Sequence, residues 1–373
     1  MVGSKYLINA TNLHVGGGVQ VATSLIGELS RFDVLPDNLF IWVSSAVDHN
    51  LRELGYNIDR FENYQTVNSY GLKFIFSKMH KKMNDFDKVF TVFGPLYTFN
   101  KNFFSIVGFA QPWIIYPDND VLPLLSVKQK VYLKLKFFFQ KFFFKLSNFI
   151  FVELEHVATE LEKQNIIKSE NIQVVRNCIS SIYLEQNCWM KLSFDINSDN
   201  LKIGFLGRNY THKNTGILPF VKTILYDKYG INVDFFVTFT NDEWDLCTEN
   251  FKNNMTNVGS LSVAQCPSFY EEMDAIIFPS LLECFSATPL ESMVMGKPLF
   301  ASDRVFNRDI CSSYSFYFDP LSPESAASVI AKYFSDDSFR ESISLSEAKE
   351  YALSFSNAHE RARQYLNCLL EPI

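Results

Sequence analysis

Residues 275–296 of the chain read AIIFPSLLECFSATPLESMVMG. The first four residues are apolar and predict a buried strand that ends at Pro279. A helix is predicted to begin near Pro289, with Thr288 as its N-cap, and to stop at Gly296. A helix that directly follows a buried strand is the repeating unit of a parallel sheet. The stretch therefore predicts an α/β fold.

Predicted strands and helices alternate along the whole chain, with one interruption. Further strands are predicted at 5–9, 39–44, 88–93, 148–153, 172–175, 201–206, 233–239, 298–301 and 315–318, and the last helices at 323–335, 337–352 and 356–370. Residues 181–200 lose all periodicity and predict a linker. We therefore expect two Rossmann-like, doubly wound domains, 1–185 and 195–355. Ligands of such sheets bind beyond the carboxyl ends of the strands, so we expect the function in the cleft between the domains.

The composition is that of a globular protein. Of the 373 residues, 47% are hydrophobic and 20% are charged, which excludes intrinsic disorder. The seven cysteines are odd in number and form no Cys-x-x-Cys pair, which favours a reducing compartment over a disulfide or zinc framework. No signal-peptide pattern or membrane-spanning apolar stretch is found, so we expect a cytoplasmic protein. A net charge of −7 argues against nucleic-acid binding.

The predicted helix start after residue 285 is suited to bind an anion. The backbone amides of Ser286, Ala287, Thr288 and Leu290 point out of the helix N-terminus, where the helix dipole favours a group such as a diphosphate. Glu283 and Glu291 would be repelled by phosphates, so we expect both to accept hydrogen bonds from sugar hydroxyls. The alternative for Glu291 is a capping box with Thr288.

A second motif, GFLGRNYTHKN at 204–214, ends the first strand of the second domain. Its cations Arg208 and Lys213 flank the loop and are candidates for binding a diphosphate and neutralising a leaving group without a metal. The alternative is two solvated surface cations. His212 is interpreted as a loop residue.

A third motif is the glycine run at 16–18. It is not a dinucleotide-binding fingerprint, because Val21 stands where the third glycine would be. Gly17 and Gly18 let the backbone approach a ligand closely, although a plain strand-to-helix turn explains them as well. The stretch Asp118-Asn119-Asp120 looks like a metal-binding Asp-x-Asp, but it lies in a proline-bounded loop of the first domain and no metal is expected there.

Together these motifs resemble the family-4 retaining glycosyltransferases of the GT-B fold, and the resemblance spans nearly the whole chain. The residues that carry it are Gly16–Gly18, Val175-Arg176-Asn177, Arg208 with Lys213, and Phe278-Pro279-Ser280 leading to Glu283 and Glu291. Two departures are Ser286, where the family often has glycine, and the absence of histidine from Gly108–Trp113. The groups around the reacting carbon, including any general base, are therefore left unassigned.

The resemblance implies a role for each candidate residue. Arg208 and Lys213 would hold the diphosphate of a nucleotide diphosphate-sugar, and Glu283 would contact the donor sugar; these are the expected catalytic residues. Glu291 would bind the ribose hydroxyls, and backbone near Val258 would border the base. Transfer would retain the anomeric configuration and need no metal or other cofactor. The final helix, 356–370, would pack back on the first domain.

The segment 128–146 is basic and rich in phenylalanine. Lys130, Lys134, Lys141 and Lys145 form one stripe at helical spacing, and residues 70–145 carry 12 Lys+Arg against 4 Asp+Glu. Such a helix suits the anionic inner face of the cytoplasmic membrane, and its alternative is a core helix whose lysines extend to water. The hypothesis is a polyprenyl-diphosphate-linked glycan acceptor in surface polysaccharide (O-antigen or capsule) assembly.

Two other functions fit the same architecture. A nucleotide-sugar epimerase would need acid/base carboxylates and a histidine along the donor sugar, and the first domain shows no such set. A non-catalytic nucleotide-sugar-binding protein is disfavoured because both cations and both glutamates are present. Incubation with nucleotide sugar alone separates the epimerase, which needs no acceptor.

Overall fold

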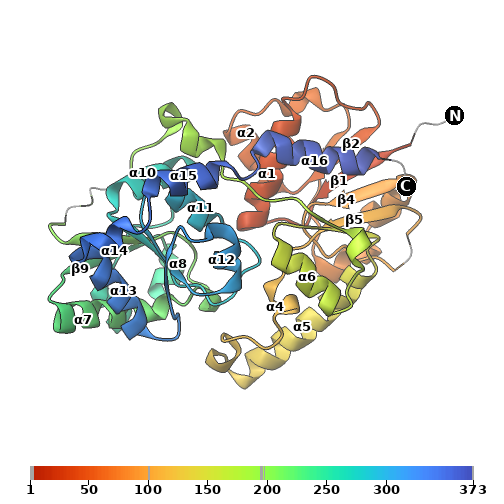
Figure 1. Cartoon of the computed structure of the whole chain (residues 1–373). Helices are drawn as coiled ribbons and strands as arrows, with labels where there is room; N and C mark the ends of the chain where they lie inside the picture. The colour runs from red at the N-terminus through yellow and green to blue at the C-terminus, as the bar shows by residue number, and fades with distance from the viewer. Residues whose placement is uncertain (1–3, 100, 194–195, 197, 372–373) are drawn as a thin grey trace. The chain divides into compact units, whose positions relative to one another are not determined.

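The structure is a computed structural model that describes all residues except 1–3, 100, 194–195, 197 and 372–373. The chain folds as two compact units. The first unit comprises Met1–Pro117, Ser126–Cys178 and Ser356–Ile373, and the second comprises Asp118–Leu125 and Ile179–Phe355. Each unit is built on one parallel sheet flanked by helices (Figure 1).

The sheet of the first unit has the strand order β3-β2-β1-β4-β5-β6-β7. Its strands are β1 (Tyr6–Ala10), β2 (Leu39–Val43), β3 (Tyr64–Thr66), β4 (Lys88–Thr91), β5 (Phe104–Gly108), β6 (Phe149–Val152) and β7 (Ile172–Val174). Its α-helices are α1 (Gly17–Leu29), α2 (Ser45–Glu53), α3 (Lys78–Lys82), α4 (Pro112–Ile115), α5 (Val127–Lys145), α6 (Glu155–Lys163) and α16 (Ala358–Leu370). Central strands such as β4 are buried along their whole length because helices cover both faces of the sheet.

The helix at the end of the chain completes the core of the first unit. In Figure 1, α16 lies against α1, from the opposite end of the sequence. Ala362, Tyr365, Leu366 and Leu369 of α16 pack with the buried side chains of α1 and the central strands. Apolar residues spaced three and four apart thus supply the stripe that an amphipathic helix buries.

The sheet of the second unit has the strand order β10-β9-β8-β11-β12-β13. Its strands are β8 (Leu201–Phe205), β9 (Val233–Val237), β10 (Met255–Asn257), β11 (Ala275–Phe278), β12 (Leu299–Ser302) and β13 (Phe316–Phe318). The first strand, β8, pairs with β9 on one side and with β11 on the other. The strand order therefore reverses between β8 and β11, which is the topological switch point where open α/β sheets bind ligands.

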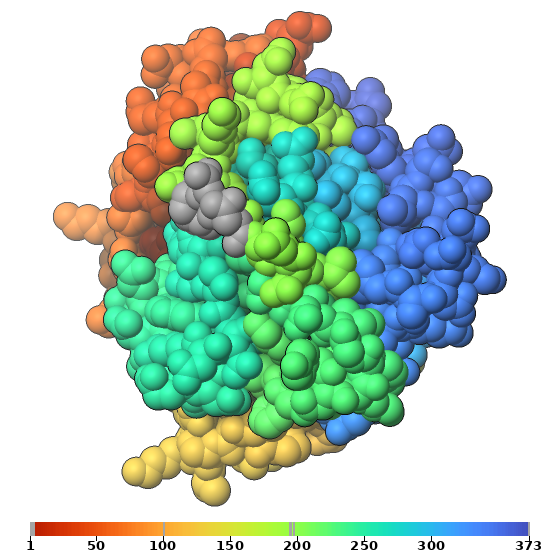
Figure 2. All heavy atoms as spheres, turned by 90° about the vertical axis from the view of Figure 1, so that its left-hand side faces the viewer, coloured from red at the N-terminus to blue at the C-terminus, as the bar shows by residue number. Residues whose placement is uncertain are grey.

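Helices cover both faces of this second sheet. They are α7 (Leu218–Tyr229), α8 (Asn241–Asp245), α9 (Glu249–Asn254), α10 (Cys266–Glu272), α11 (Ala287–Val294), α12 (Val305–Cys311), α13 (Pro323–Ser335), α14 (Asp337–Glu341) and α15 (Leu345–Leu353). Helices α7 and α13 pack side by side, and Figure 2 shows their neighbouring green and blue surfaces. Beside β8, a Cβ on Gly204 would lie 2.7 Å from Met273 Cγ, so glycine permits the close packing of α10.

The predicted fold class is confirmed, with local corrections. The patterns do not predict β3, β5 and β10, and the helix predicted over 337–352 is two helices, α14 and α15. The Thr288 cap is wrong: α11 begins at Ala287, with Ser286 as its N-cap. Residues 118–125 and 179–185, which were predicted to belong to the first domain, group with the second unit. Within the described residues, every helix is too short or too polar to cross a bilayer.

Candidate functional site

The loop that follows β8 carries both predicted cations and is held by its own asparagines. Asn209 accepts a hydrogen bond from the Thr215 hydroxyl at 2.9 Å, and Asn214 donates to the carbonyl of Pro320 at 2.8 Å. Asn214 adopts a left-handed conformation with φ of 56°, which asparagine tolerates better than most residues. The position of the loop is therefore fixed at both ends.

This loop meets the segment that leads from β11 into α11. The amide of Leu281 donates to the carbonyl of His212 at 2.8 Å. The Thr288 hydroxyl lies 3.5 Å from the carbonyl of Leu206. Residues 206–213 and the first turn of α11 thus lie together beyond the carboxyl ends of β8 and β11. The amides of Ser286, Ala287 and Thr288 have no carbonyl partner within α11. The Leu290 amide lies four residues after the N-cap Ser286 and bonds to its carbonyl, so the prediction that it points out of the helix N-terminus is wrong.

Lys213 and Glu283 form a shielded ion pair at this edge. Lys213 Nζ lies 2.6 Å from Glu283 Oε1, and the two side chains are only 14% and 11% exposed. The same ammonium lies 5.0 Å from the ring centroid of Phe278, at the end of β11. The alternative that Lys213 is a solvated surface cation is thereby excluded. Its ammonium is held by Glu283, which lies three residues before the N-cap of α11, and it keeps further N–H donors.

His212 lies beside this pair but is not the charged partner. Its Nε2 is 3.9 Å from Glu283 Oε1. Burial lowers the pKa of His212 below its ordinary value of 6.5, and this outweighs the opposing effect of Glu283. The imidazole is therefore neutral at pH 7, and the charge opposite Glu283 comes from Lys213.

Arg208 pairs with a carboxylate that the sequence analysis missed. Its Nε donates to Glu243 Oε1 at 2.7 Å, and the same oxygen accepts the amide of Asn209 at 3.2 Å. Glu243 also forms the capping box of α8 with Thr240, a Thr-x-x-Glu pattern visible in the sequence. The Arg208 side chain is 47% exposed, so this pairing fixes Nε while the guanidinium keeps other N–H donors.

Glu291 makes no capping box. The Tyr270 hydroxyl donates to Glu291 Oε2 at 2.8 Å, and Tyr183 bonds to the same carboxylate. Burial raises the pKa of Glu291, while both tyrosines act in the opposite direction. The capping alternative is therefore wrong, and Tyr183 and Tyr270 are partners that no motif in the sequence indicated.

The remaining predicted residues lie on other elements. Val258 follows β10, and its amide donates to the carbonyl of Val237 at 2.9 Å. Gly17 and Gly18 open α1 in the first unit, and a Cβ on Gly17 would meet no atom within 4 Å. Asp120 pairs with Arg304 at 2.5 Å. Among the described residues no group of three His, Cys, Asp or Glu side chains is arranged to hold a metal ion.

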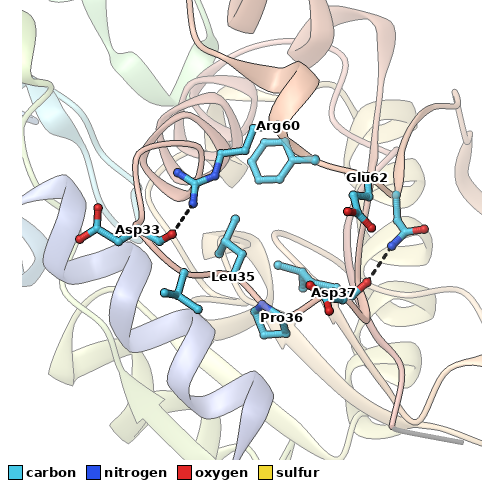
Figure 3. Close-up of a pocket in the computed structure, with 10 residues that line it drawn as sticks. Asp33, Leu35, Pro36, Asp37, Arg60 and Glu62 are labelled. Carbon is cyan, nitrogen blue, oxygen red and sulfur yellow. Dashed lines mark hydrogen bonds between the residues drawn. The ribbon is translucent and has the colours of Figure 1, made fainter.

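A pocket of about 240 Å³ in the first unit is separate from these residues (Figure 3). It is lined by residues 33–37, by Leu39 at the start of β2, and by residues 60–63, which precede β3. Arg60 donates to the carbonyl of Asp33 at 2.9 Å, and Asn63 donates to the carbonyl of Asp37 at 3.0 Å. The pocket thus lies at the amino ends of the strands, opposite to the edge where such sheets bind ligands.

Comparisons with solved structures agree with the fold described above. HepE of Anabaena, solved in complex with UDP and glucose, matches with a TM-score of 0.68 and 14% identity over 98% of this chain and 99% of that one. A glycosyltransferase from Rickettsia africae matches with a TM-score of 0.66 and 16% identity over 99% and 100%. Sucrose-phosphate synthase from Thermosynechococcus elongatus matches with a TM-score of 0.63 and 12% identity over 97% of each chain. The chain therefore has the GT-B fold.

The sequence comparisons also match glycosyltransferases. Residues 248–350 match the family described as glycosyl transferases group 1. The O-antigen chain mannosyltransferase RfbU of Salmonella typhimurium is 22% identical over 221 residues, which are 58% of this chain and 56% of that protein. The alignment thus spans little more than half of this curated relative. The predicted resemblance to GT-B glycosyltransferases is confirmed.

Proposed function

We propose that the chain is a retaining, metal-independent glycosyltransferase that takes its sugar from a nucleotide diphosphate-sugar. The observation that supports this most is the junction of the β8 loop with the start of α11. This junction brings the Lys213 ammonium close to the first turn of α11 at the topological switch point of the second unit, and the Arg208 guanidinium belongs to the same β8 loop. This is the donor set that a diphosphate requires.

In this proposal each residue acts on a different part of the donor. The backbone N–H groups of Ser286, Ala287 and Thr288 bind the diphosphate together with Lys213 and Arg208, and they stabilise the charge that it gains as it leaves. Glu283 keeps Lys213 oriented and accepts hydrogen bonds from the donor sugar. Glu291 binds the ribose, and the backbone at Val258 borders the base. The first unit, with Gly17 and Gly18 at the start of α1, takes the acceptor.

The proposed transfer requires neither a metal ion nor a general base from the protein. The bond from the anomeric carbon to the diphosphate breaks, and a bond from that carbon to an acceptor hydroxyl oxygen forms on the same face of the sugar. The hydroxyl proton passes to the departing diphosphate. Lys213 and Arg208 offset the negative charge that remains on it.

The acceptor that we propose is a glycan, linked to polyprenyl diphosphate, in O-antigen or capsule assembly. The activity in the name of the Salmonella relative supports a surface polysaccharide, and the UDP complex of HepE supports a nucleotide-sugar donor. The test is a thermal-shift screen with UDP, GDP and their sugars, followed by transfer to a lipid-linked glycan extract. A donor that raises the melting temperature and yields a product only with acceptor supports the proposal. Conversion of the nucleotide sugar without acceptor would identify an epimerase instead.

Helix α5 presents a surface suited to an anionic membrane, which we propose as its partner. Lys128, Lys134, Lys136 and Lys145 are exposed, whereas Lys130 and Lys141 of the predicted stripe are part-buried, and Lys141 donates to Gln164 at 2.7 Å. The exposed apolar side chains of α5 are Val127, Val131, Tyr132, Leu135, Phe138, Phe139 and Phe142. Exposed lysine and phenylalanine on one helix match the headgroup and acyl boundary of a bilayer.

Replacing Lys128, Lys134 and Lys145 together with glutamate should release the protein from vesicles that contain anionic lipid. Each basic residue near such a surface contributes about 1 kcal/mol, and the substitutions also add repulsion. We therefore expect at least a hundredfold weaker partition in vesicle co-sedimentation.

The matched control introduces the same change in net charge at three lysines of the second unit. Lys191, Lys228 and Lys349 are also exposed, and their triple glutamate variant should bind vesicles as the wild type does. Equal loss in both variants would show a net-charge effect, and absence of binding by the wild type would remove the membrane proposal.

A further inference from the structure

The carboxylate of Glu291 is enclosed by two tyrosines from different elements. Tyr270 belongs to α10, and Tyr183 belongs to the 3₁₀ turn Ser181–Leu184. Both tyrosines are buried, and their rings meet edge to face with centroids 5.9 Å apart. Since Tyr270 donates to Glu291 at 2.8 Å and Tyr183 bonds to the same carboxylate, the orientation of Glu291 is set by both.

The groups that face Glu291 are uncharged hydrogen-bond donors. Burial raises the pKa of Tyr183 and of Tyr270, so both phenols stay protonated at neutral pH. Burial likewise raises the pKa of Cys266, which also belongs to α10, to about 12. The ionised form of Glu291 is therefore stabilised by phenol hydrogen bonds, against the desolvation that raises its pKa.

A carboxylate has more acceptor capacity than the tyrosines use. Its two oxygens offer about four lone-pair directions. The hydrogen bonds from Tyr270 and Tyr183 account for two of these directions, which leaves acceptor capacity for a ligand. A vicinal diol, such as that of a ribose, offers two hydroxyl donors at the spacing of the two oxygens of a carboxylate.

We propose that Tyr183 and Tyr270 are positioning residues that orient the Glu291 carboxylate toward the ribose diol of the donor nucleotide and so set the preference for ribonucleotides. The inference rests on the proposed function, because it needs a nucleotide at this site. It goes beyond that function by assigning ribose selectivity to side chains outside the recognised motifs. A purely structural pair would fill the same space without affecting which sugar is bound.

The test compares UDP and GDP with their 2′-deoxy analogues by isothermal titration calorimetry, using the full chain. The wild type should bind one ribonucleotide more tightly than its deoxy analogue. Tyr270→Phe and Tyr183→Phe, which keep the rings, should each weaken ribonucleotide binding about tenfold and leave deoxynucleotide binding unchanged. Tyr333→Phe, at another buried tyrosine of the same unit, should change neither affinity.

The pH dependence provides a second readout that packing alone would not change. Because the phenol hydrogen bonds lower the pKa of Glu291, their removal should raise it further. Ribonucleotide affinity requires the ionised carboxylate, so it should fall with decreasing pH in all variants. In Tyr270→Phe the fall should begin at a higher pH than in the wild type.

Each outcome decides the inference. A wild type that binds nucleotide but does not distinguish ribose from deoxyribose overturns it. Variants whose ribose preference and pH profile equal those of the wild type also overturn it, while the proposed function stands. A wild type that binds none of the four nucleotides contradicts the proposed function, and the inference fails with it.

Discussion

Replacing Lys213 with alanine should lower kcat/KM for sugar transfer by about 10²–10³-fold, as loss of one preorganised donor to a developing charge does. Lys213 is held 2.6 Å from Glu283 and is largely shielded from water, so its charge acts in a medium of reduced dielectric. Its removal takes away a donor to the diphosphate and leaves the Glu283 carboxylate without its counter-ion. The measurement is steady-state kinetics with the donor found in the thermal-shift screen.

Lys222 offers a matched control. It lies on α7 and pairs with Asp234 at 3.0 Å, with both side chains partly shielded. Lys222→Ala thus removes a comparable pair from the same unit and should keep wild-type kcat/KM. In addition, Lys213→Ala combined with Glu283→Gln should recover stability that the single variant loses, because no carboxylate is then left unpaired, yet it should not recover turnover. Wild-type activity in Lys213→Ala would refute its role at the diphosphate.

Replacing Arg361 with methionine should lower the free energy of unfolding of the first unit by about 3–5 kcal/mol, the range for breaking a buried charged network. Arg361 lies on α16, is 2% exposed, and donates to Asn177 Oδ1 and, at 2.9 Å, to Ser24 Oγ. Asn177 in turn donates to buried Glu153 at 2.6 Å. Urea unfolding followed by circular dichroism gives the change.

The decrease in the free energy of unfolding caused by Arg361→Met should become larger as the pH rises. Burial raises the pKa of Glu153 from its ordinary value of 4.5 to about 7, although Arg361 and Asn177 act to lower it. A carboxyl group with a raised folded-state pKa favours the folded state at low pH, and this contribution is lost as pH rises from 4.5 through 7. Without Arg361 the pKa of Glu153 rises further, so the variant should be more destabilised at pH 8 than at pH 6.

The control for this prediction lies on the same helix. Arg363 is 57% exposed and pairs with Glu360, so Arg363→Met should change the free energy of unfolding by less than about 1 kcal/mol. Equal effects of the two arginine variants, or a cost of Arg361→Met that does not depend on pH, would contradict the buried network.

The sequence predicted the fold well because most strands are buried on both faces and read as apolar runs between helices. The strand Ala275–Phe278 is predicted to the residue, since Pro279 ends its apolar run. The strands β3 and β10 have three residues each and lie at sheet edges. Strands that are so short and only partly buried do not produce a recognisable run of apolar residues. The predicted helix over 337–352 divides because Ser344 caps a new helix, α15.

The sequence motifs predicted which residues form the candidate site, but they did not predict which side chains pair with those residues. Arg208, Lys213, Glu283 and Glu291 stand out because each lies near a strand end or helix start. Their partners Glu243, Tyr183 and Tyr270 come from distant parts of the chain, and only the packing of α8, α10 and the turn at 181–184 brings them close. The Thr288 cap was mispredicted because Thr-x-x-Glu spacing does not by itself ensure the hydrogen bonds of a capping box. Here the Thr288 hydroxyl bonds to the carbonyl of Leu206, and Glu291 accepts from Tyr270.

The most direct test of the diphosphate site is calorimetric titration of UDP and GDP into the wild type, Lys213→Ala, Arg208→Ala and Lys222→Ala. At least one nucleoside diphosphate should bind the wild type and Lys222→Ala equally, and its affinity should fall at least tenfold in both Lys213→Ala and Arg208→Ala. Equal affinity in all four proteins, or no binding of either nucleotide to the wild type, would contradict a diphosphate site at the start of α11.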